Sequence, residues 1–331
     1  MSDYPAAWWG GTKMNQNQRQ GSTKASETRT IQIPFKPPYD WNPIIRFLQP
    51  RAIPGLETVS SQSYKRAFKI GSSSGLLEVR PSLEEHCLDL TLPPIPRADL
   101  NRIIARVSRL FDCDADPMPI YRHLSRQRLL TNVVALHPGI RVPGAFDGFE
   151  IAIRAVLGQQ ITVRAATTMA GRLVASYGNP LDESESPSAA RLFPSAEVLV
   201  DADLTRVGLT RAKARAIAGL AHAHLSQPTL FEPSNNPSAA IARLVEIPGV
   251  GQWTAQYIAM RALKDPDAFP ASDLGLRRAV SGGGDLVSSK ELEERSAGWR
   301  PWRAYSAMHL WSSLGHADPG PTLAADVSHD G

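Results

Sequence analysis

The sequence has few cysteines and no long apolar run. Only two of its 331 residues are cysteine, which excludes a disulfide scaffold, a four-cysteine zinc site and an iron–sulfur cluster held by four thiolates. A membrane span would need roughly 18 consecutive apolar residues, and no such run is present. The N-terminus also lacks the apolar core and cleavage site of a secretory signal. These absences predict a protein of the reducing cytoplasm.

The charges of the chain are nearly balanced. Its 36 Lys and Arg residues against 32 Asp and Glu residues give a formal net charge of +4. A mildly basic balance is compatible with a nucleic-acid partner but does not single one out. His, Cys, Asp and Glu show no spacing typical of a zinc site. With 42% hydrophobic residues, the chain is long enough to bury two or three cores.

The residue patterns divide the chain into four parts. Residues 1–30 are rich in Gln, Ser, Thr, Asn and Gly without periodicity, which predicts a disordered tail. Residues 31–118 predict an α+β domain, because alternating apolar and polar residues mark strands at 31–35, 64–70, 75–82 and 86–92, and helical stripes mark 41–52 and 100–112. Residues 119–320 predict an all-helical core with two subdomains, and 321–331 a loose tail. The expected fold class is α+β, an antiparallel-sheet domain followed by helices.

One stretch of the helical part, LVEIPGVGQWTAQYIAM at 244–260, combines a glycine-rich turn with a following helix. Pro248 ends the first helix, and Gly249 and Gly251 can adopt positive φ and let another backbone approach. Exposed amides beside a helix N-terminus form a donor site for phosphate. A phosphate contact positions DNA without reading its bases. The predicted DNA contacts are Gly249, Val250, Gly251 and Thr254, and the alternative is an ordinary helix–turn–helix corner.

The stretch 240–263 resembles a helix–hairpin–helix DNA-binding element, and FPASD follows it at 269–273. Together they resemble the HhH-GPD superfamily of DNA glycosylases. Three further blocks, 37–52, 146–166 and 298–311, occur in the same order as in its alkylated-purine branch, the DNA-3-methyladenine glycosylase II type. The resemblance covers about residues 35–318. It implies a glycosylase that flips out alkylated purines and excises them by hydrolysis in base excision repair.

The resemblance also implies a catalytic role for Asp273. Cleavage of the bond between base and deoxyribose builds positive charge on the sugar, and a carboxylate near C1′ would stabilise that charge and orient water. The alternative for a lone aspartate in a loop is a helix N-cap, and both roles are compatible. Ser272 stands where some relatives have a second acidic residue, so one carboxylate is expected here.

An aromatic pocket for the flipped base is a further implication. Aromatic faces attract a cationic alkylated base through stacking and cation–π interaction. The alternative is that these aromatic residues belong to the hydrophobic core. Leu274 replaces a tyrosine common in the family, which leaves the substrate range open. The predicted pocket residues are Trp253, Tyr257, Trp311 and Phe47.

Three more expectations follow from the resemblance. Bifunctional relatives have a Schiff-base lysine at the position of Trp253, so a monofunctional enzyme without lyase activity is expected. Gln160 is expected to fill the gap that the flipped base leaves in the duplex. A structural monovalent cation could bind the hairpin through main-chain carbonyls, and no catalytic cofactor is expected. The carbonyls concerned belong to Val245, Ile247 and Val250.

The expected partner is double-stranded DNA with alkylated bases, bound by a monomer that does not contact membranes. In the cell it would lie at the nucleoid of a bacterium or in the nucleus of a eukaryote. A fusion that also transfers methyl groups to cysteine is not expected, because the N-terminal tail is short and has no cysteine. Two alternatives stay open. One is a glycosylase for deaminated, etheno or oxidised bases, and the other is a non-catalytic helix–hairpin–helix module that binds damaged DNA.

Overall fold

The computed structural model of the protein describes residues 28–181, 190–233 and 236–314. The predicted C-terminal tail and nearly all of the predicted N-terminal tail lie outside these residues. The first element, β1, already begins at Arg29. Within the described residues, no helix is both long and apolar enough to cross a membrane.

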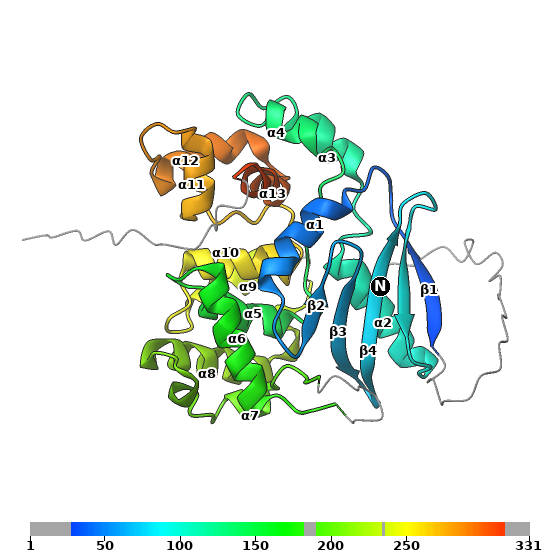
Figure 1. The fold of residues 1–331 in the computed structure, drawn as a ribbon. Helices are drawn as coiled ribbons and strands as arrows, with labels where there is room; N and C mark the ends of the chain where they lie inside the picture. The colour runs from blue at the N-terminus through cyan, green and yellow to red at the C-terminus, as the bar shows by residue number, and fades with distance from the viewer. Residues whose placement is uncertain (1–27, 182–189, 234–235, 315–331) are drawn as a thin grey trace, which may run out of the picture.

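The N-terminal part is a five-stranded antiparallel sheet with strand order β1-β5-β4-β3-β2 (Figure 1). Its strands are β1 (Arg29–Pro34), β2 (Glu57–Val59), β3 (Tyr64–Ile70), β4 (Ser73–Ser82) and β5 (Cys87–Leu92). The predicted α+β fold class is confirmed, and the alternating segments form strands as expected. Three residues are too few to show alternation, so β2 was not predicted. Helix α2 (Arg97–Leu110) packs against the sheet through its predicted stripe of Leu100, Ile103, Val107 and Leu110.

Helices make up most of the remaining described chain (Figure 1). The predicted break near Gly158 separates α5 from α6, and the helix–hairpin–helix consists of α9 and α10. The α-helices after α2 are α3 (Pro117–Leu124), α4 (Thr131–Leu136), α5 (Gly148–Leu157), α6 (Val163–Tyr177), α7 (Ala196–Leu199), α8 (Arg211–Ser226), α9 (Pro237–Val245), α10 (Gln252–Arg261), α11 (Leu274–Ser281), α12 (Ser289–Arg295) and α13 (Arg303–Ser313). Short 3₁₀ helices are η2 (Gln49–Arg51), η3 (Leu204–Val207), η4 (Pro228–Phe231) and η5 (Ser296–Trp299).

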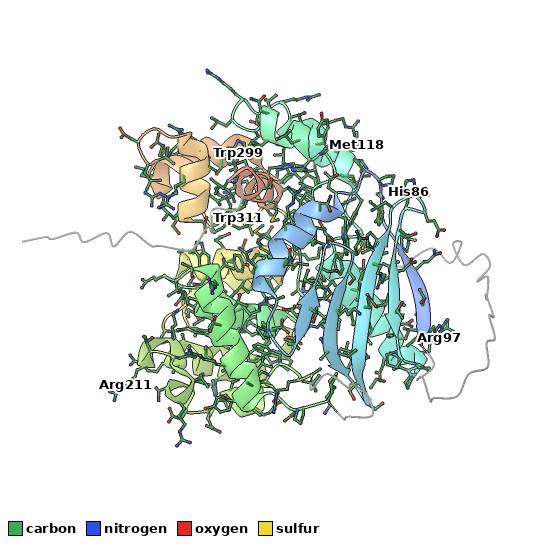
Figure 2. All side chains as sticks on the ribbon, in the orientation of Figure 1. His86, Arg97, Met118, Arg211, Trp299 and Trp311 are labelled. Atoms are coloured by element: carbon green, nitrogen blue, oxygen red, sulfur yellow. The ribbon has the colours of Figure 1, made fainter. Side chains whose placement is uncertain are left out.

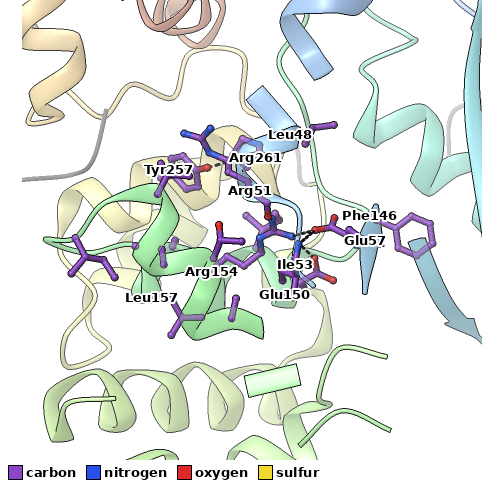
Figure 3. Close-up of a pocket in the computed structure, with 18 of the residues that line it drawn as sticks. Leu48, Arg51, Ile53, Glu57, Phe146, Glu150, Arg154, Leu157, Tyr257 and Arg261 are labelled. Atoms are coloured by element: carbon purple, nitrogen blue, oxygen red, sulfur yellow. Dashed lines mark hydrogen bonds and ion pairs between the residues drawn. The ribbon is translucent and has the colours of Figure 1, made fainter. Parts of the chain in front are cut away.

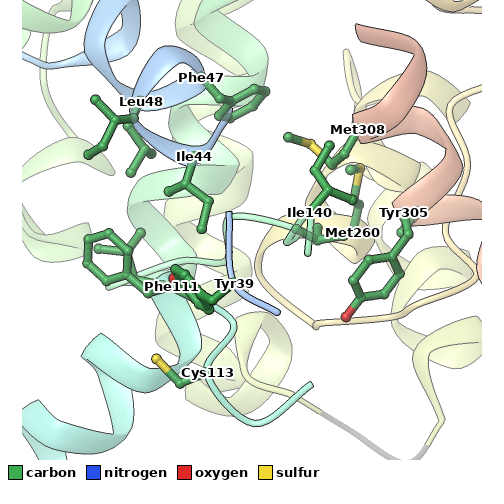
Figure 4. Packing of buried hydrophobic residues seen from close by; sticks show 14 of the residues in the cluster. Tyr39, Ile44, Phe47, Leu48, Phe111, Cys113, Ile140, Met260, Tyr305 and Met308 are labelled. Atoms are coloured by element: carbon green, nitrogen blue, oxygen red, sulfur yellow. The ribbon is translucent and has the colours of Figure 1, made fainter. Parts of the chain in front are cut away.

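Two hydrophobic cores organise these elements. Figure 2 shows the side chains of the described residues on the ribbon. The first core joins the sheet to α1 (Trp41–Leu48), α2 and the C-terminal helices; the second joins α5 through α10. Figure 4 shows Ile44, Phe47 and Leu48 of α1 on one side of the first core, with Met260 and Met308 on the other. Burying each such apolar side chain contributes about 1.5–3 kcal/mol.

Helix α10 belongs to both cores. Its Ala255 and Ile258 face the second core, while Ala259 and Met260 face the first. A helix buried on two sides has no broad solvent-facing polar stripe, and the residues left over lie along the junction between the cores. The junction therefore holds the segment that carries Trp253 and its neighbours.

Candidate active site

Helix α10 and the loop after it bring the predicted catalytic residue to the predicted pocket. Trp253 and Tyr257 are one helical turn apart and lie on the same side of α10. The Gln256 side chain accepts a hydrogen bond at 3.0 Å from the backbone N–H of Phe269. This contact ties the loop that leads to Asp273 back to the helix, so the aspartate and the aromatic residues have a fixed mutual geometry.

Asp273 holds its carboxylate against neutral N–H donors. Its Oδ1 accepts hydrogen bonds from the Trp311 indole and the Leu276 backbone, each at 3.0 Å. Its Oδ2 accepts one from the Trp253 indole, also at 3.0 Å. The residue is the N-cap of α11 and is 3% exposed. Burial raises the pKa of Asp273, and the bonds from Trp311, Leu276 and Trp253 offset only part of that rise.

A cavity of about 90 Å³ lies where the helical core meets the N-terminal domain (Figure 3). Asp273 is one of the residues that line it. Trp253, Tyr257 and Trp311 line it as predicted. The rings of Trp253 and Tyr257 stack with centroids 5.2 Å apart, and Trp311 is tilted to Tyr257 at 6.5 Å. Phe47 is not among the lining residues. It is 8% exposed and stacks on Trp311 at 6.1 Å, because α1 turns it into the first core.

Arginine residues also line the cavity, and the sequence reasoning did not place them there. The Arg51 guanidinium lies 3.9 Å from the ring centroid of Phe47, and that of Arg261 lies 4.7 Å from it. Arg261 also donates a hydrogen bond of 2.7 Å to the Tyr257 hydroxyl. Burial raises the pKa of Tyr257, but Arg261, Arg51 and Arg154 outweigh it, and the pKa lies below its usual value. Arg51 and Arg261 thus bring positive charge to the aromatic part of the cavity.

Deeper in the cavity, a buried ionic network joins the sheet to α5. Arg66 of β3 donates to Glu150 at 2.7 Å, and Arg154 contacts both Glu150 and Glu57 at 2.9 Å. Burial raises the pKa of Glu57, but Arg154 and Arg66 lower it further, so the net shift is downward. Arg154 also donates to the backbone carbonyl of Arg51. The network fixes the N-terminal domain on the helical core and holds Arg51 at the cavity.

The hairpin shows where a phosphate contact is possible. Gly249 has φ +89°, and both Gly249 and Gly251 are exposed. Gly251 differs from expectation because its φ is −84°, which does not require glycine. Val250 is 4% exposed and donates its N–H to the Ile247 carbonyl. Thr254 is 2% exposed, so a phosphate at the hairpin would meet backbone before it met this hydroxyl.

Gln160 stands at the tip of the loop between α5 and α6. It is exposed and has φ +59°, a left-handed conformation that is uncommon for a residue with a side chain. Its neighbour Gln159 points the other way and donates from Nε2 to the Gly249 carbonyl and the Thr254 hydroxyl, each at 2.8 Å. The sequence reasoning missed Gln159, because its partners Gly249 and Thr254 are distant in sequence and meet it only in the folded protein.

Main-chain carbonyls of the hairpin remain the predicted cation ligands. The Ile247 carbonyl accepts the Val250 N–H at 2.9 Å, and a carbonyl oxygen has a second lone pair for a cation. Within the described residues, no group of three or more His, Cys, Asp or Glu side chains could hold a metal ion. The carbonyls of Val245, Ile247 and Val250 stay a prediction as ligands of a cation at the hairpin.

Comparison with known proteins supports the resemblance. Residues 30–147 match the AlkA N-terminal domain, and residues 153–303 match the HhH-GPD superfamily of base excision DNA repair proteins. DNA-3-methyladenine glycosylase 2 of Escherichia coli is 30% identical over 85% of this chain and 96% of its own length. The fold is shared with a 3-methyladenine DNA-glycosylase from Archaeoglobus fulgidus, with TM-score 0.74, 21% identity and coverage of 86% and 97% of the two chains.

A longer relative is the probable bifunctional transcriptional activator/DNA repair enzyme AlkA of Mycobacterium tuberculosis. It is 38% identical over 90% of this chain, which spans 59% of the relative's length. Together the matches define a helix–hairpin–helix protein that resembles the HhH-GPD superfamily of base excision DNA repair proteins. The chain belongs to the family of DNA-3-methyladenine glycosylase 2, in which an AlkA N-terminal domain precedes the HhH-GPD domain. The resemblance inferred from the sequence blocks is confirmed.

Proposed function

We propose that the protein is a monofunctional DNA glycosylase that flips alkylated purines out of double-stranded DNA and excises them by hydrolysis. The observation that carries the proposal is the buried Asp273 carboxylate in the wall of an aromatic cavity. Membership of the 3-methyladenine glycosylase family supports the same reaction. We further propose that it acts as a monomer in the cytoplasm.

The surroundings of Asp273 suit the stabilisation of a cationic sugar. The indoles of Trp253 and Trp311 orient the carboxylate through neutral N–H groups, so its negative charge is not cancelled by a cationic partner. A charge held in a site with little water acts more strongly on a developing opposite charge than it would in solvent. An N3- or N7-alkylated purine leaves readily because it is already positive, so little acid catalysis of the leaving group is required.

The absence of lyase chemistry is part of the proposal. A lyase would need an amine nucleophile at C1′. Trp253 occupies the position of that amine, and among the described residues that line the cavity there is no lysine. Water is therefore the proposed nucleophile. Borohydride reduction during turnover should trap no covalent enzyme–DNA adduct, and recovery of such an adduct would refute this part.

The central test is base release from alkylated duplex DNA, followed by chromatography, with the wild type and Asp273→Asn side by side. We expect free 3-methyladenine from the wild type, no strand scission before alkali treatment, and release lost in the variant. Wild-type release by Asp273→Asn would refute the catalytic assignment. No release of any methylated purine by the wild type would refute the proposed substrate class.

The arginines favour a second candidate, a glycosylase for neutral bases that present oxygen acceptors, such as deaminated purines. Arg51 and Arg261 bring positive charge to the cavity, which disfavours a cationic base and offers hydrogen-bond donors to a carbonyl. The same assay with hypoxanthine-containing DNA separates the two candidates. Faster release of hypoxanthine than of 3-methyladenine would favour the second.

A further inference from the structure

Residues on one side of α8 contact two elements that are expected to bind DNA, the helix–hairpin–helix turn and the loop that carries Gln160. We define the hairpin as residues 246–251 and the plug loop as residues 158–162. A Cβ atom added at Gly249 of the hairpin would lie 2.8 Å from Cβ of Ala216, and one added at Gly219 would lie 2.8 Å from Cγ2 of Ile247. Lys213 is three residues before Ala216, so it lies on the same side of the helix.

Lys213 reaches from this side of α8 to the plug loop. Its Nζ donates hydrogen bonds to the backbone carbonyls of Leu157 at 2.7 Å and Gln159 at 2.9 Å. Leu157 is the last residue of α5, where carbonyls lack partners within the helix and the helix dipole favours a cation. The two bonds hold the backbone on either side of Gly158, directly before Gln160.

Gln159 completes the link from the plug loop to the hairpin. Its side-chain amide bonds to the Gly249 carbonyl and to Thr254 in the first turn of α10. The loop is thus attached to α8 through Lys213 and to the hairpin through Gln159. Both attachments hold the backbone that leads into Gln160, whose left-handed conformation is unfavourable for a residue with a side chain and must be maintained by its surroundings.

We infer that Lys213 and Gln159 are positioning residues that make the hairpin and the plug loop move as one body, so that a phosphate bound at the hairpin places Gln160 against the base stack. This inference rests on the proposed function and adds the device that drives base flipping. A glutamine is a weaker wedge than an apolar side chain. Its insertion therefore depends on a loop that is already in place, because ordering a mobile loop at the moment of binding would cost free energy.

The decisive experiment separates flipping from chemistry. We would compare the wild type with Lys213→Met and Gln159→Met, which remove the donors but keep side-chain length. Arg215→Met is the matched control, because Arg215 is an exposed residue of the same helix and also loses one positive charge. Each variant is measured in single-turnover excision on two duplexes. One has the lesion opposite a normal base, and the other has it opposite an abasic site, where extrusion is easier.

We expect Lys213→Met and Gln159→Met to slow excision from the paired duplex about tenfold, and from the abasic duplex no more than about twofold, as lost hydrogen bonds that act on flipping alone would do. The fluorescence of 2-aminopurine beside the lesion, which reports unstacking, should fall in parallel. Lys213→Arg should restore both signals. The double variant should be no slower than the slower single variant, because the loop stays in place only while both attachments are made, so that losing either one already releases it.

Two results would overturn the inference. Equal slowing on both duplexes would show that Lys213 and Gln159 act on chemistry or on general stability, which thermal melting of each variant would also reveal. Wild-type excision rates on both duplexes in both variants would show that the attachments do not matter for flipping. If the wild type released no base at all, the proposed function would fail, whereas the fluorescence comparison on DNA with a stable abasic analogue would still decide this inference.

Discussion

Two buried carboxylate sites lie along the same cavity, and they are built in opposite ways. Glu57 is surrounded by Arg154 and Arg66, and its pKa is lowered because these cations outweigh the effect of burial. Asp273 is bound only by neutral N–H groups, and burial leaves its pKa raised. The charge of Glu57 is thus neutralised by neighbouring arginines. The carboxylate of Asp273 is held in one orientation, but no cationic side chain of the described residues is bonded to it.

The difference teaches which buried acid is available for chemistry. A carboxylate paired with arginine forms an ion pair that joins two parts of the fold, and its charge is neutralised by that partner. A carboxylate held by indole and backbone N–H groups costs more to keep ionised, and that cost is recovered only when a positive charge arrives. In the proposed reaction, the oxocarbenium character of a departing deoxyribose is such a charge, and Asp273 would then be the reactive member of the two.

Of the variants that test this difference between Asp273 and Glu57, Asp273→Asn should have the largest effect on activity. Excision should fall by about 10²- to 10³-fold, the range for removing one preorganised electrostatic contact to a transition state. Asparagine still accepts the Leu276 N–H as an N-cap, so the melting temperature should change little. Single-turnover base release and thermal melting measure the two quantities. A matching loss of stability and activity would mean that Asp273 is mainly structural.

Glu150→Gln should lower stability more than activity, the reverse of what is expected for Asp273→Asn. It leaves the buried guanidinium groups of Arg66 and Arg154 short of an anionic partner, which destabilises a fold by about 3 kcal/mol or more. Urea denaturation should reveal the loss, while the folded fraction keeps an excision rate within about tenfold of wild type. An unchanged midpoint would show that the network contributes nothing to the union of the two domains.

Sequence patterns predicted the frame of the molecule and the loop in which Asp273 lies. The alternating strands, the hairpin and the loop that carries Asp273 depend on local residue order, which is visible without coordinates. The family resemblance then named Trp253 and Trp311, and the structure brings both to the same carboxylate. Their hydrogen bonds to Asp273 were not predicted, because they depend on how α10 and α13 meet.

What escaped prediction depends on long-range partners. Arg66 and Glu150 are far apart in sequence and pair only after β3 lies on α5. Arg154 follows Glu150 by one helical turn, a pair readable from the sequence as a local contact, but nothing there shows that it is buried at a cavity. Phe47 failed to line the cavity for a similar reason, since either face of α1 could have turned toward it.

The indole N–H donors of Trp253 and Trp311 can be removed without changing Asp273 itself, and the expected effect on excision is smaller than that of Asp273→Asn. Trp253→Phe and Trp311→Phe keep an aromatic face but remove one N–H from Asp273, and each should slow excision about tenfold, the effect of one hydrogen bond to a charged group. Trp302→Phe serves as the control, because Trp302 packs on Tyr305 away from this carboxylate. Equal rates for all three variants would mean that stacking alone matters at these positions.

The smallest expected effect is a shift of the pH profile. A carboxyl with a raised pKa is protonated first as the pH falls, so activity should be lost through Asp273 while Glu57, with its lowered pKa, keeps its charge. The linkage has opposite signs. Ionised Glu57 contributes stability that is lost as pH falls through its lowered pKa, whereas protonation of buried Asp273 removes a destabilising charge. The acid limb of excision should therefore precede acid unfolding followed by circular dichroism.

The indole variants should move that acid limb further. Because the Trp311 and Trp253 bonds hold the pKa of Asp273 down, removing either one should shift the limb to higher pH by less than about one unit, the equivalent of one modest hydrogen bond. Trp302→Phe should leave it in place. If the limb instead coincided with unfolding in every variant, the activity would report the ionic network around Glu57, and Asp273 would lose its standing as the reactive carboxylate.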